Sequence, residues 1–215
     1  FMQRIEKMLA GMLMRKPVRL DDTSDLVREQ LFDVDLEGND LNIWLYQTAR
    51  TVISFGHVGV LVDAPREGSK ARPYWVTYKP SDILGWRTEI IDGVRELIQV
   101  RLLENVVEPD GQYGEKSITQ IRVLERGRFE LHRKSEKTGK FELYEEGEMS
   151  LKDKIPFSVA YSNRTGFFES RSPLYDIAEL NLKHYQIQSD LDNILHISAV
   201  PNLVVYGFPN SDEIT

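Results

Sequence analysis

Apolar residues recur at helical spacing in three segments of the first fifty-six positions, and a loop follows the first of them. The first helix is expected to end near residues 11–16, because Pro17 disfavours helical backbone in the residue before it. A short helix is expected from Ser24 to Leu31. A third follows the good N-cap residue Asp40 and closes on Gly56. The apolar faces contain Phe1, Ile5, Met8, Leu9 and Met12 in the first helix, and Leu41, Trp44, Leu45, Ala49, Val52 and Ile53 in the third.

From Val58 onward the pattern changes to short apolar runs that are typical of β-strands. Runs at 58–62 and 72–78 are rich in β-branched and aromatic residues, and the preceding helix is expected to pack on their sheet. Between 83 and 161, apolar segments alternate with turn signals, which predicts an antiparallel meander. These signals are Asp92-Gly93, Asp110-Gly111, Arg126-Gly127 and Thr138-Gly139. The expected fold class is therefore α+β, with helices packed on an antiparallel β-meander.

A long helix is predicted from Ser172 to Ser198, with Ser172 as its N-cap and Pro173 at its first position. At the helical rise it would extend for roughly 40 Å. A spacing near 3.5 residues gives it one apolar face that includes a histidine. This face contains Leu174, Ile177, Leu180, His184, Ile187, Leu191 and Ile194. The periodicity by itself fits an ordinary core helix as well as an interface helix.

After Pro201 the pattern predicts a strand that contains Leu203, Val204, Val205 and Tyr206. Residues 209–213 then have the character of a turn, an N-cap and the acidic first turn of another helix. The chain also begins with helical spacing and no capping residue. Both ends are therefore expected to be cut.

The composition is that of a folded globular chain, since 41% of the 215 residues are apolar and 28% are charged. No apolar run approaches the roughly 18 residues of a membrane span, so no contact with a membrane is expected. The lack of cysteine excludes disulfides, thiolate zinc sites and thiol nucleophiles. The formal net charge of -7 argues against a broad phosphate-binding surface, although transient passage of duplex DNA is compatible with it.

Residue types that catalyse reactions or bind metals are present without the spacing that such chemistry needs. The histidines His57, His132, His184 and His196 lie in different segments or too far apart on one helix to share a metal. Residues 135–140 contain the letters of a phosphate-binding loop in the wrong arrangement. The acidic clusters at 21–22, 33–37 and 145–148 are best explained as solvated loops. No catalytic residue, metal site or cofactor is therefore expected, and Phe167-Phe168 is interpreted as a hydrophobic staple or a subunit contact.

Several segments follow one another in a characteristic order along nearly the whole chain. They are Met8-Leu-Ala-Gly-Met-Leu-Met-Arg-Lys-Pro17, Gly56-His-Val-Gly-Val-Leu-Val-Asp-Ala-Pro65, Arg72-Pro-Tyr74, Pro80-Ser-Asp-Ile-Leu-Gly-Trp-Arg87, Ser172-Pro-Leu174, Asp176-Ile-Ala-Glu-Leu-Asn-Leu-Lys-His-Tyr185 and Pro201-Asn-Leu-Val-Val-Tyr-Gly207. In this order they resemble tailed-bacteriophage portal proteins related to a phage family long classed as a domain of unknown function.

The resemblance implies a structural subunit of a portal ring and not an enzyme. Such rings of about twelve subunits occupy one capsid vertex and pass the genome through a central channel. Residues 1–170 would be a wing-like domain, 171–199 a stem-like helix whose apolar face contacts neighbouring subunits, and 200–215 the start of a clip. The implied partners are further copies of the chain, the packaging terminase, and capsid and tail-adaptor proteins. Contact with duplex DNA would be transient and non-specific, in the virion and, during assembly, in the host cytoplasm.

Two functions from other classes also fit the sequence. One is an adaptor or other virion module that presents its β-meander to a protein partner. The other is a hydrolase whose catalytic half lies outside this chain. A monomeric state at high concentration would favour the adaptor, and a turnover abolished by one carboxylate or histidine substitution would favour the hydrolase.

Overall fold

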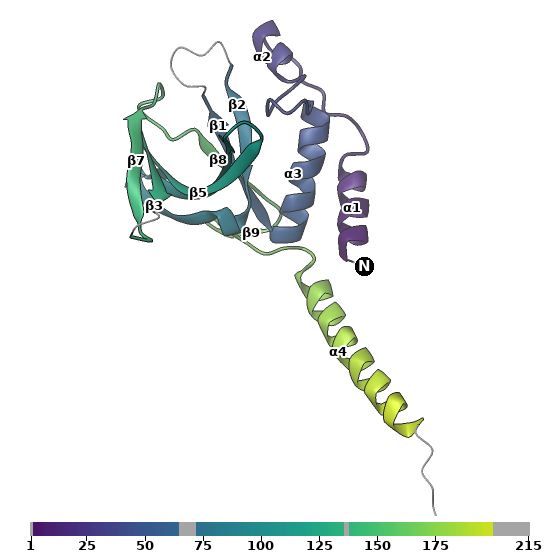
Figure 1. Ribbon diagram of the computed structural model, residues 1–215. Coiled ribbons are helices and arrows are strands. Elements are labelled where there is room, and N and C mark those ends of the chain that lie inside the picture. The colour runs from purple at the N-terminus through teal and green to yellow at the C-terminus, as the bar shows by residue number, and fades with distance from the viewer. Residues whose placement is uncertain (1, 65–71, 136–137, 200–215) are drawn as a thin grey trace, which may run out of the picture. The chain divides into compact units, whose positions relative to one another are not determined.

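The structure is a computed structural model that describes residues 2–64, 72–135 and 138–199. Contacts divide the chain into two compact units, Phe1–Pro173 and Leu174–Thr215. Helices α1 (Met2–Leu13), α2 (Asp25–Gln30) and α3 (Leu41–Phe55) begin the first unit (Figure 1). The short helix η1 (Pro80–Asp82) and all the strands follow: β1 (His57–Asp63), β2 (Tyr74–Tyr78), β3 (Ile83–Ile91), β4 (Val94–Asp110), β5 (Gly114–Glu125), β6 (Arg128–Lys134), β7 (Phe141–Glu148), β8 (Phe157–Tyr161), β9 (Arg164–Gly166) and β10 (Glu169–Ser170). The second unit contains α4 (Tyr175–Ser198).

Local signals at both ends delimit α3. The Asp40 side chain accepts a hydrogen bond from Ile43 N at 2.8 Å, and Gly56 closes the helix with a φ of 90°. Leu41, Trp44, Thr48, Ala49 and Ile53 are buried at helical spacing. The predicted cap, closing glycine and apolar face are therefore confirmed.

The first helix packs beside α3, and the Arg50 side chain bridges them through Glu6 Oε1 at 2.6 Å. Only Ala10 of α1 is buried among its described residues. Met8 and Met12 of the predicted apolar face are 53% and 66% exposed, so part of that prediction is wrong. The small side chain of Ala10, and not the long ones of Met8 and Met12, is buried, which suits close packing of α1 on α3.

A three-stranded antiparallel sheet has the strand order β2-β1-β8. It packs against α3 through β1, as expected from the apolar run at 58–62. His57 pairs with Tyr161, and Leu61 pairs with Phe157. The predicted meander therefore ends before β8, because β8 leaves it to pair with β1.

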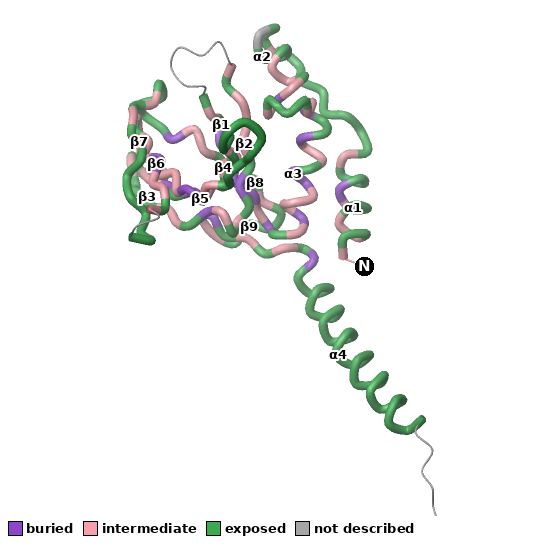
Figure 2. Tube along the Cα trace, viewed as in Figure 1, coloured by how far each residue is buried: buried purple, intermediate pink, exposed green. Residues whose placement is uncertain are grey.

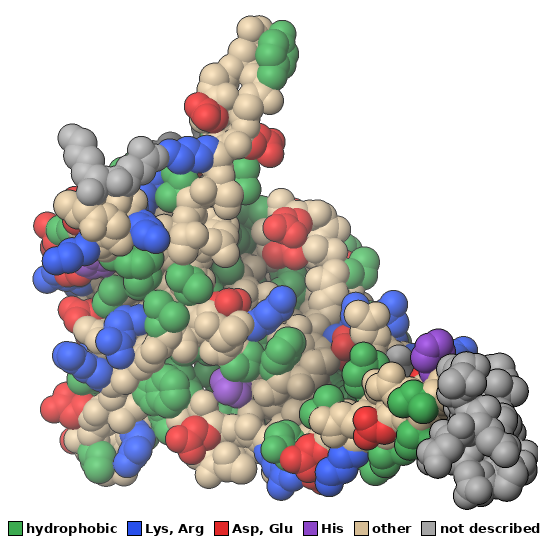
Figure 3. Space-filling view, turned by 60° about the horizontal axis from the view of Figure 1, so that its bottom comes forward, with side chains coloured by type: hydrophobic (Ala, Val, Ile, Leu, Met, Phe, Trp, Pro, Cys, Tyr) green, Lys and Arg blue, Asp and Glu red, His purple; other side chains and the backbone are tan. Residues whose placement is uncertain are grey.

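The five-stranded sheet is a meander with the order β3-β4-β5-β6-β7. Gly93, Gly111, Gly127 and Gly139 all have a φ near 70–80°, which confirms the four predicted turns. The hairpin of β4 and β5 is longer than its neighbours. Beyond Leu102 it no longer pairs with β3, and before Gln120 it no longer pairs with β6. Residues 103–119 therefore form a two-stranded arm, which projects at the top of Figure 3.

The main core lies between the two sheets. Leu61 and Tyr78 contribute from the three-stranded sheet, and Val100, Leu102 and Leu124 contribute from the meander. Val100 and Leu102 are fully buried. Burial follows the pleat on both sheets, since alternate side chains point to the same face.

Helix α4 starts at Tyr175, three residues later than predicted. Ser172 is not its N-cap, because the Ser172 hydroxyl donates to the Ile53 carbonyl at 2.7 Å instead. No residue of α4 is buried (Figure 2). The α+β class is confirmed by these helices and antiparallel sheets.

Candidate functional site

The predicted apolar face of α4 is exposed to solvent along the helix. Ile177 is 38% exposed, and Leu180 and Ile187 are both 67% exposed. Leu191, Ile194 and His184 lie on the same face and are exposed as well. Leu174 differs from them, since it precedes the helix and is only 5% exposed. An apolar helix face that is open to water is typical of a surface that another protein covers.

Apolar side chains also occur on the other side of α4, which the sequence analysis missed. Leu182 follows Leu180 by two residues, a rotation of about 200° around the helix axis. Leu182 is 58% exposed, and Tyr185 and Ile197 are each 71% exposed. Helix α4 therefore carries apolar side chains on two sides. A search for a single heptad stripe passes over the second set.

The predicted clip residues Leu203, Val204, Val205 and Tyr206 lie outside the described residues. The structure therefore provides no description of residues 200–215.

Hydrogen bonds fasten the segment before α4 within the first unit. His57 Nδ1 lies 2.9 Å from Ser170 Oγ, and Ser162 Oγ donates to the Gly56 carbonyl at 3.0 Å. Ser172 adds the bond to Ile53 described above. Burial lowers the pKa of His57, which favours its neutral form. These bonds tie residues 162–172 to the end of α3 and the start of β1.

A charged cluster links the two sheets. Arg122 of β5 contacts Asp63 of β1 at 2.7 Å and Glu104 of β4 at 2.8 Å. Tyr78 of β2 donates to Glu104 at 2.6 Å, and Gln120 donates to its other oxygen at 2.7 Å. Burial and the Glu104 charge raise the pKa of Tyr78, so its hydroxyl remains a donor. Burial disfavours charge on Arg122, but Glu104 and Asp63 outweigh it and raise the pKa. The cluster therefore stabilises the contact between the two sheets.

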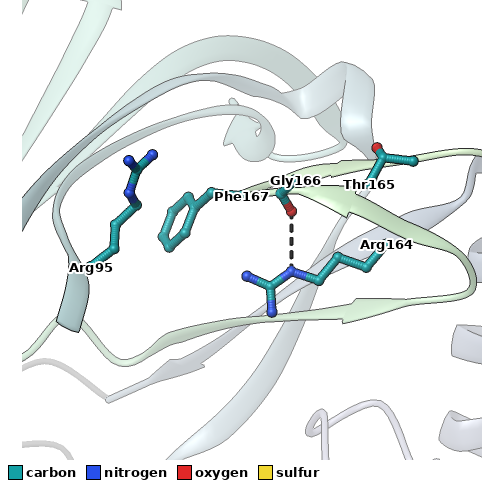
Figure 4. Close-up of a pocket in the computed structure, with 5 residues that line it drawn as sticks. All are labelled: Arg95, Arg164, Thr165, Gly166 and Phe167. Carbon is teal, nitrogen blue, oxygen red and sulfur yellow. Dashed lines mark hydrogen bonds between the residues drawn. The ribbon is translucent and has the colours of Figure 1, made fainter.

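A shallow hollow of about 550 Å³ opens beside the β9–β10 hairpin (Figure 4). The side chains of Arg95 and Arg164 lie on opposite sides of the Phe167 ring. Arg164 Nε donates to the Gly166 carbonyl at 3.1 Å. In the described part of the chain neither guanidinium forms an ion pair with a carboxylate, so the hollow favours anions. Glu169, whose carboxylate lies against Gly166, offsets part of this charge.

Phe167 and Phe168 stack with their ring centroids 4.7 Å apart. Phe168 is buried in the main core and adopts a positive φ of 58°. Phe168 packs against Trp86 and Phe157 of the sheets and so anchors the hairpin that holds Arg164. The predicted staple across the start of a helix is therefore wrong for Phe168.

The acidic loop at 33–37 is an ordered turn. Asp33 Oδ1 accepts from Gly38 N at 2.9 Å, and Asp35 Oδ2 accepts from the Asn39 side chain at 2.7 Å. Across residues 2–64, 72–135 and 138–199, no three His, Asp or Glu side chains gather as a metal site. In the same residues, no helix is both long and apolar enough to cross a bilayer.

Residues 173–215 match a sequence family described as a domain of unknown function, DUF4055. The match starts at Pro173 and covers all of α4. No curated protein sequence matches the chain.

Proposed function

We propose that this chain is the wing and stem region of a tailed-bacteriophage portal subunit. Its role would be structural: several copies form a ring at a capsid vertex, which docks the packaging motor and tail and passes the genome. The order of the segments from Met8 to Gly207 supports this proposal, as does the position of the family match on α4. The observation that carries it is the exposed, two-sided apolar surface of α4.

A closed ring needs two different contact surfaces on each subunit, because every copy has a neighbour on either side. A helix with apolar residues on one side needs only one partner. Helix α4 presents Leu180 and Ile187 on one side and Leu182 on the other, all more than half exposed. Its 24 residues span about 36 Å. This geometry suits a helix packed between two neighbouring helices.

The charge distribution suits a channel through which DNA moves without adhering. Helix α4 contains four Asp or Glu residues and one Lys. On the face shown in Figure 3, basic and acidic side chains are interspersed. Tight binding to duplex DNA requires clustered Lys and Arg that displace counterions. An acidic ring would let a duplex slide.

The test is the mass of the chain in solution, measured by mass photometry and negative-stain microscopy. Wild-type chain should form ring-sized species, and the double substitution Leu191→Asp and Ile194→Asp should reduce them to monomers. The matched control is Asn181→Asp with Gln188→Asp, which adds the same charge at polar positions between the two apolar sides of the helix and should leave the rings intact.

Circular dichroism of the same variants tests whether α4 is separate from the folded core. The double substitution Leu191→Asp and Ile194→Asp should leave the melting temperature of the first unit unchanged. A wild-type chain that stays monomeric at high concentration would contradict the portal function and favour an adaptor. Unfolding of the sheets together with loss of rings would make α4 an ordinary core helix.

A further inference from the structure

A second hollow, of about 340 Å³, lies between α3, β2 and the loop at 33–39. It belongs entirely to the first unit, so it does not depend on α4 or on the proposed ring. Trp44 and Thr48 of α3, Trp75 of β2, and Asp35 and Glu37 of the loop are among its lining residues. The hollow thus combines aromatic walls, two carboxylates and a hydroxyl.

The aromatic walls are held rigidly. The Trp44 and Trp75 rings meet edge to face, with centroids 4.9 Å apart and planes at 71°. Trp44 is 6% exposed and packs against Val34 and Leu41 in a small core. The Trp75 backbone N–H donates to the Val34 carbonyl at 2.8 Å, which fixes the loop to β2. The hollow therefore does not need to be assembled when a ligand arrives.

The Asp35 carboxylate is also held in place. Asp35 Oδ1 accepts from Glu37 N at 3.0 Å, and Asp35 Oδ2 accepts from Asn39 Nδ2 at 2.7 Å. Partial burial works to raise the pKa of Asp35, but the hydrogen bonds from Asn39 and Glu37 outweigh it and lower the pKa. Asp35 is thus ionised at neutral pH.

No neighbouring cation neutralises the hollow within the described residues. None of its described lining residues is Lys or Arg. Two arginines lie close to lining residues in the sequence, and both are paired elsewhere: Arg50 with Glu6 at 2.6 Å and Arg72 with Asp33 at 3.4 Å. Two carboxylates around a partly enclosed space repel anions and attract cations.

Thr48 provides a second, independent sign of a ligand. It is 8% exposed, and its hydroxyl oxygen is buried without a hydrogen-bond partner among the described residues. Buried hydroxyls in native proteins are usually paired, because leaving one unpaired costs free energy. A ligand donor in the hollow would give this oxygen its missing partner.

We infer that this hollow binds an organic cation, specifically a guanidinium or ammonium group such as that of an arginine or lysine side chain. Tryptophan is the best aromatic partner for a cation. Carboxylates form charge-assisted hydrogen bonds with the same groups, and a guanidinium matches them with two parallel donors. A neutral sugar could stack on the aromatic walls and donate hydroxyl hydrogen bonds to the carboxylates, but it would leave both negative charges without a counter-charge.

The experiment is ¹⁹F NMR of the chain labelled with 5-fluorotryptophan. The three tryptophans give three resonances, which single Trp→Phe substitutions assign. Arginine methyl ester, added at constant ionic strength, should shift the Trp44 and Trp75 resonances saturably, with a Kd on the order of 1 mM. Trp86, which packs in the main core, should not respond. Lysine methyl ester and tetramethylammonium distinguish a guanidinium from an ammonium preference.

Two variants locate the binding. Glu37→Gln should weaken binding about threefold to fivefold, as expected for a charge at an exposed rim. The control Glu29→Gln removes a carboxylate that does not line the hollow and should have no effect. Thr48→Val should weaken binding without lowering the melting temperature, because the removed hydroxyl has no internal partner.

Each opposite outcome overturns the inference. No saturable shift with any of the three cations means that the hollow binds no organic cation. Saturation by maltose with no response to cations makes it a sugar site. Shifts that persist unchanged in both Glu37→Gln and Thr48→Val place the binding elsewhere.

Discussion

Replacing Arg122 by methionine tests whether the charged cluster holds the two sheets together. Methionine keeps most of the side-chain volume but removes the positive charge between Asp63 and Glu104. The side chains of Arg122, Asp63 and Glu104 are 20%, 18% and 11% exposed, so both carboxylates would lose their partner in a largely buried place. Breaking a buried ion pair costs about 3–5 kcal/mol, and the remaining exposure places this one at the lower end, about 3 kcal/mol. The melting temperature should fall by about 6–12 °C.

The assay is urea and thermal unfolding of wild type and Arg122→Met, followed by circular dichroism. Lys152→Met is the matched control, because the Lys152–Glu148 pair is 72% and 83% exposed at the two side chains. It should change stability by less than about 0.5 kcal/mol. Adding Glu104→Gln to Arg122→Met should recover part of the loss, since the unpaired charge disappears. A loss below about 1 kcal/mol for Arg122→Met would refute the argument.

The raised pKa of Tyr78 means that the folded protein keeps this proton above pH 10.0, where the unfolded chain releases it. Stability should therefore fall as pH rises above 10, and Tyr78→Phe should flatten this fall while the exposed control Tyr113→Phe does not. A Cβ at Gly59 would clash with the Phe157 ring, so Gly59→Ala should lower the free energy of unfolding by about 1–3 kcal/mol in urea titrations; an unchanged midpoint would show that the ring moves aside. Titration with duplex DNA should show weak binding that is independent of sequence and lost as salt rises, and tight, salt-resistant, sequence-selective binding would contradict the portal function.

Elements with local signals could be predicted from the sequence. Helix α3 depends on the Asp40 cap and the Gly56 stop, and the four hairpin turns depend on glycines with positive φ. These signals act over a few residues and need no distant partner. The positions predicted for α3 and for the four turns were therefore correct.

Features that depend on tertiary contacts were missed or misplaced. Strand β8 has the same kind of pattern as the meander strands, and only its fit against β1 decides where it pairs. Ser172 has the right type for an N-cap, but its hydroxyl bonds to Ile53, which lies 119 positions away in the chain. Residue type alone does not distinguish such competing partners.

The same limit applies to the sites. Asp35 and Glu37 belong to a loop interpreted from sequence as solvated, and no local signal connects them with Trp75. Arg122 and Asp63 are 59 positions apart, so their pairing carries no sequence spacing that could be searched for. The exposed face of α4 was predictable, because a helix keeps its period whatever surrounds it. The second apolar side could have been found by plotting all apolar positions around the helix axis.

The pairing of β1 with β8 imposes an order on folding. The meander strands between them pair with their neighbours in sequence, so each hairpin closes a short loop as soon as it has been synthesised. The three-stranded sheet is completed later, because Gly56 and its hydrogen-bond partner Ser162 are 106 positions apart in the chain. On the ribosome, α3 and β1 emerge early and stay without their third strand until residue 161 has left the exit tunnel. The exposed edge of β1 during this interval is where we expect chaperones to bind the nascent chain.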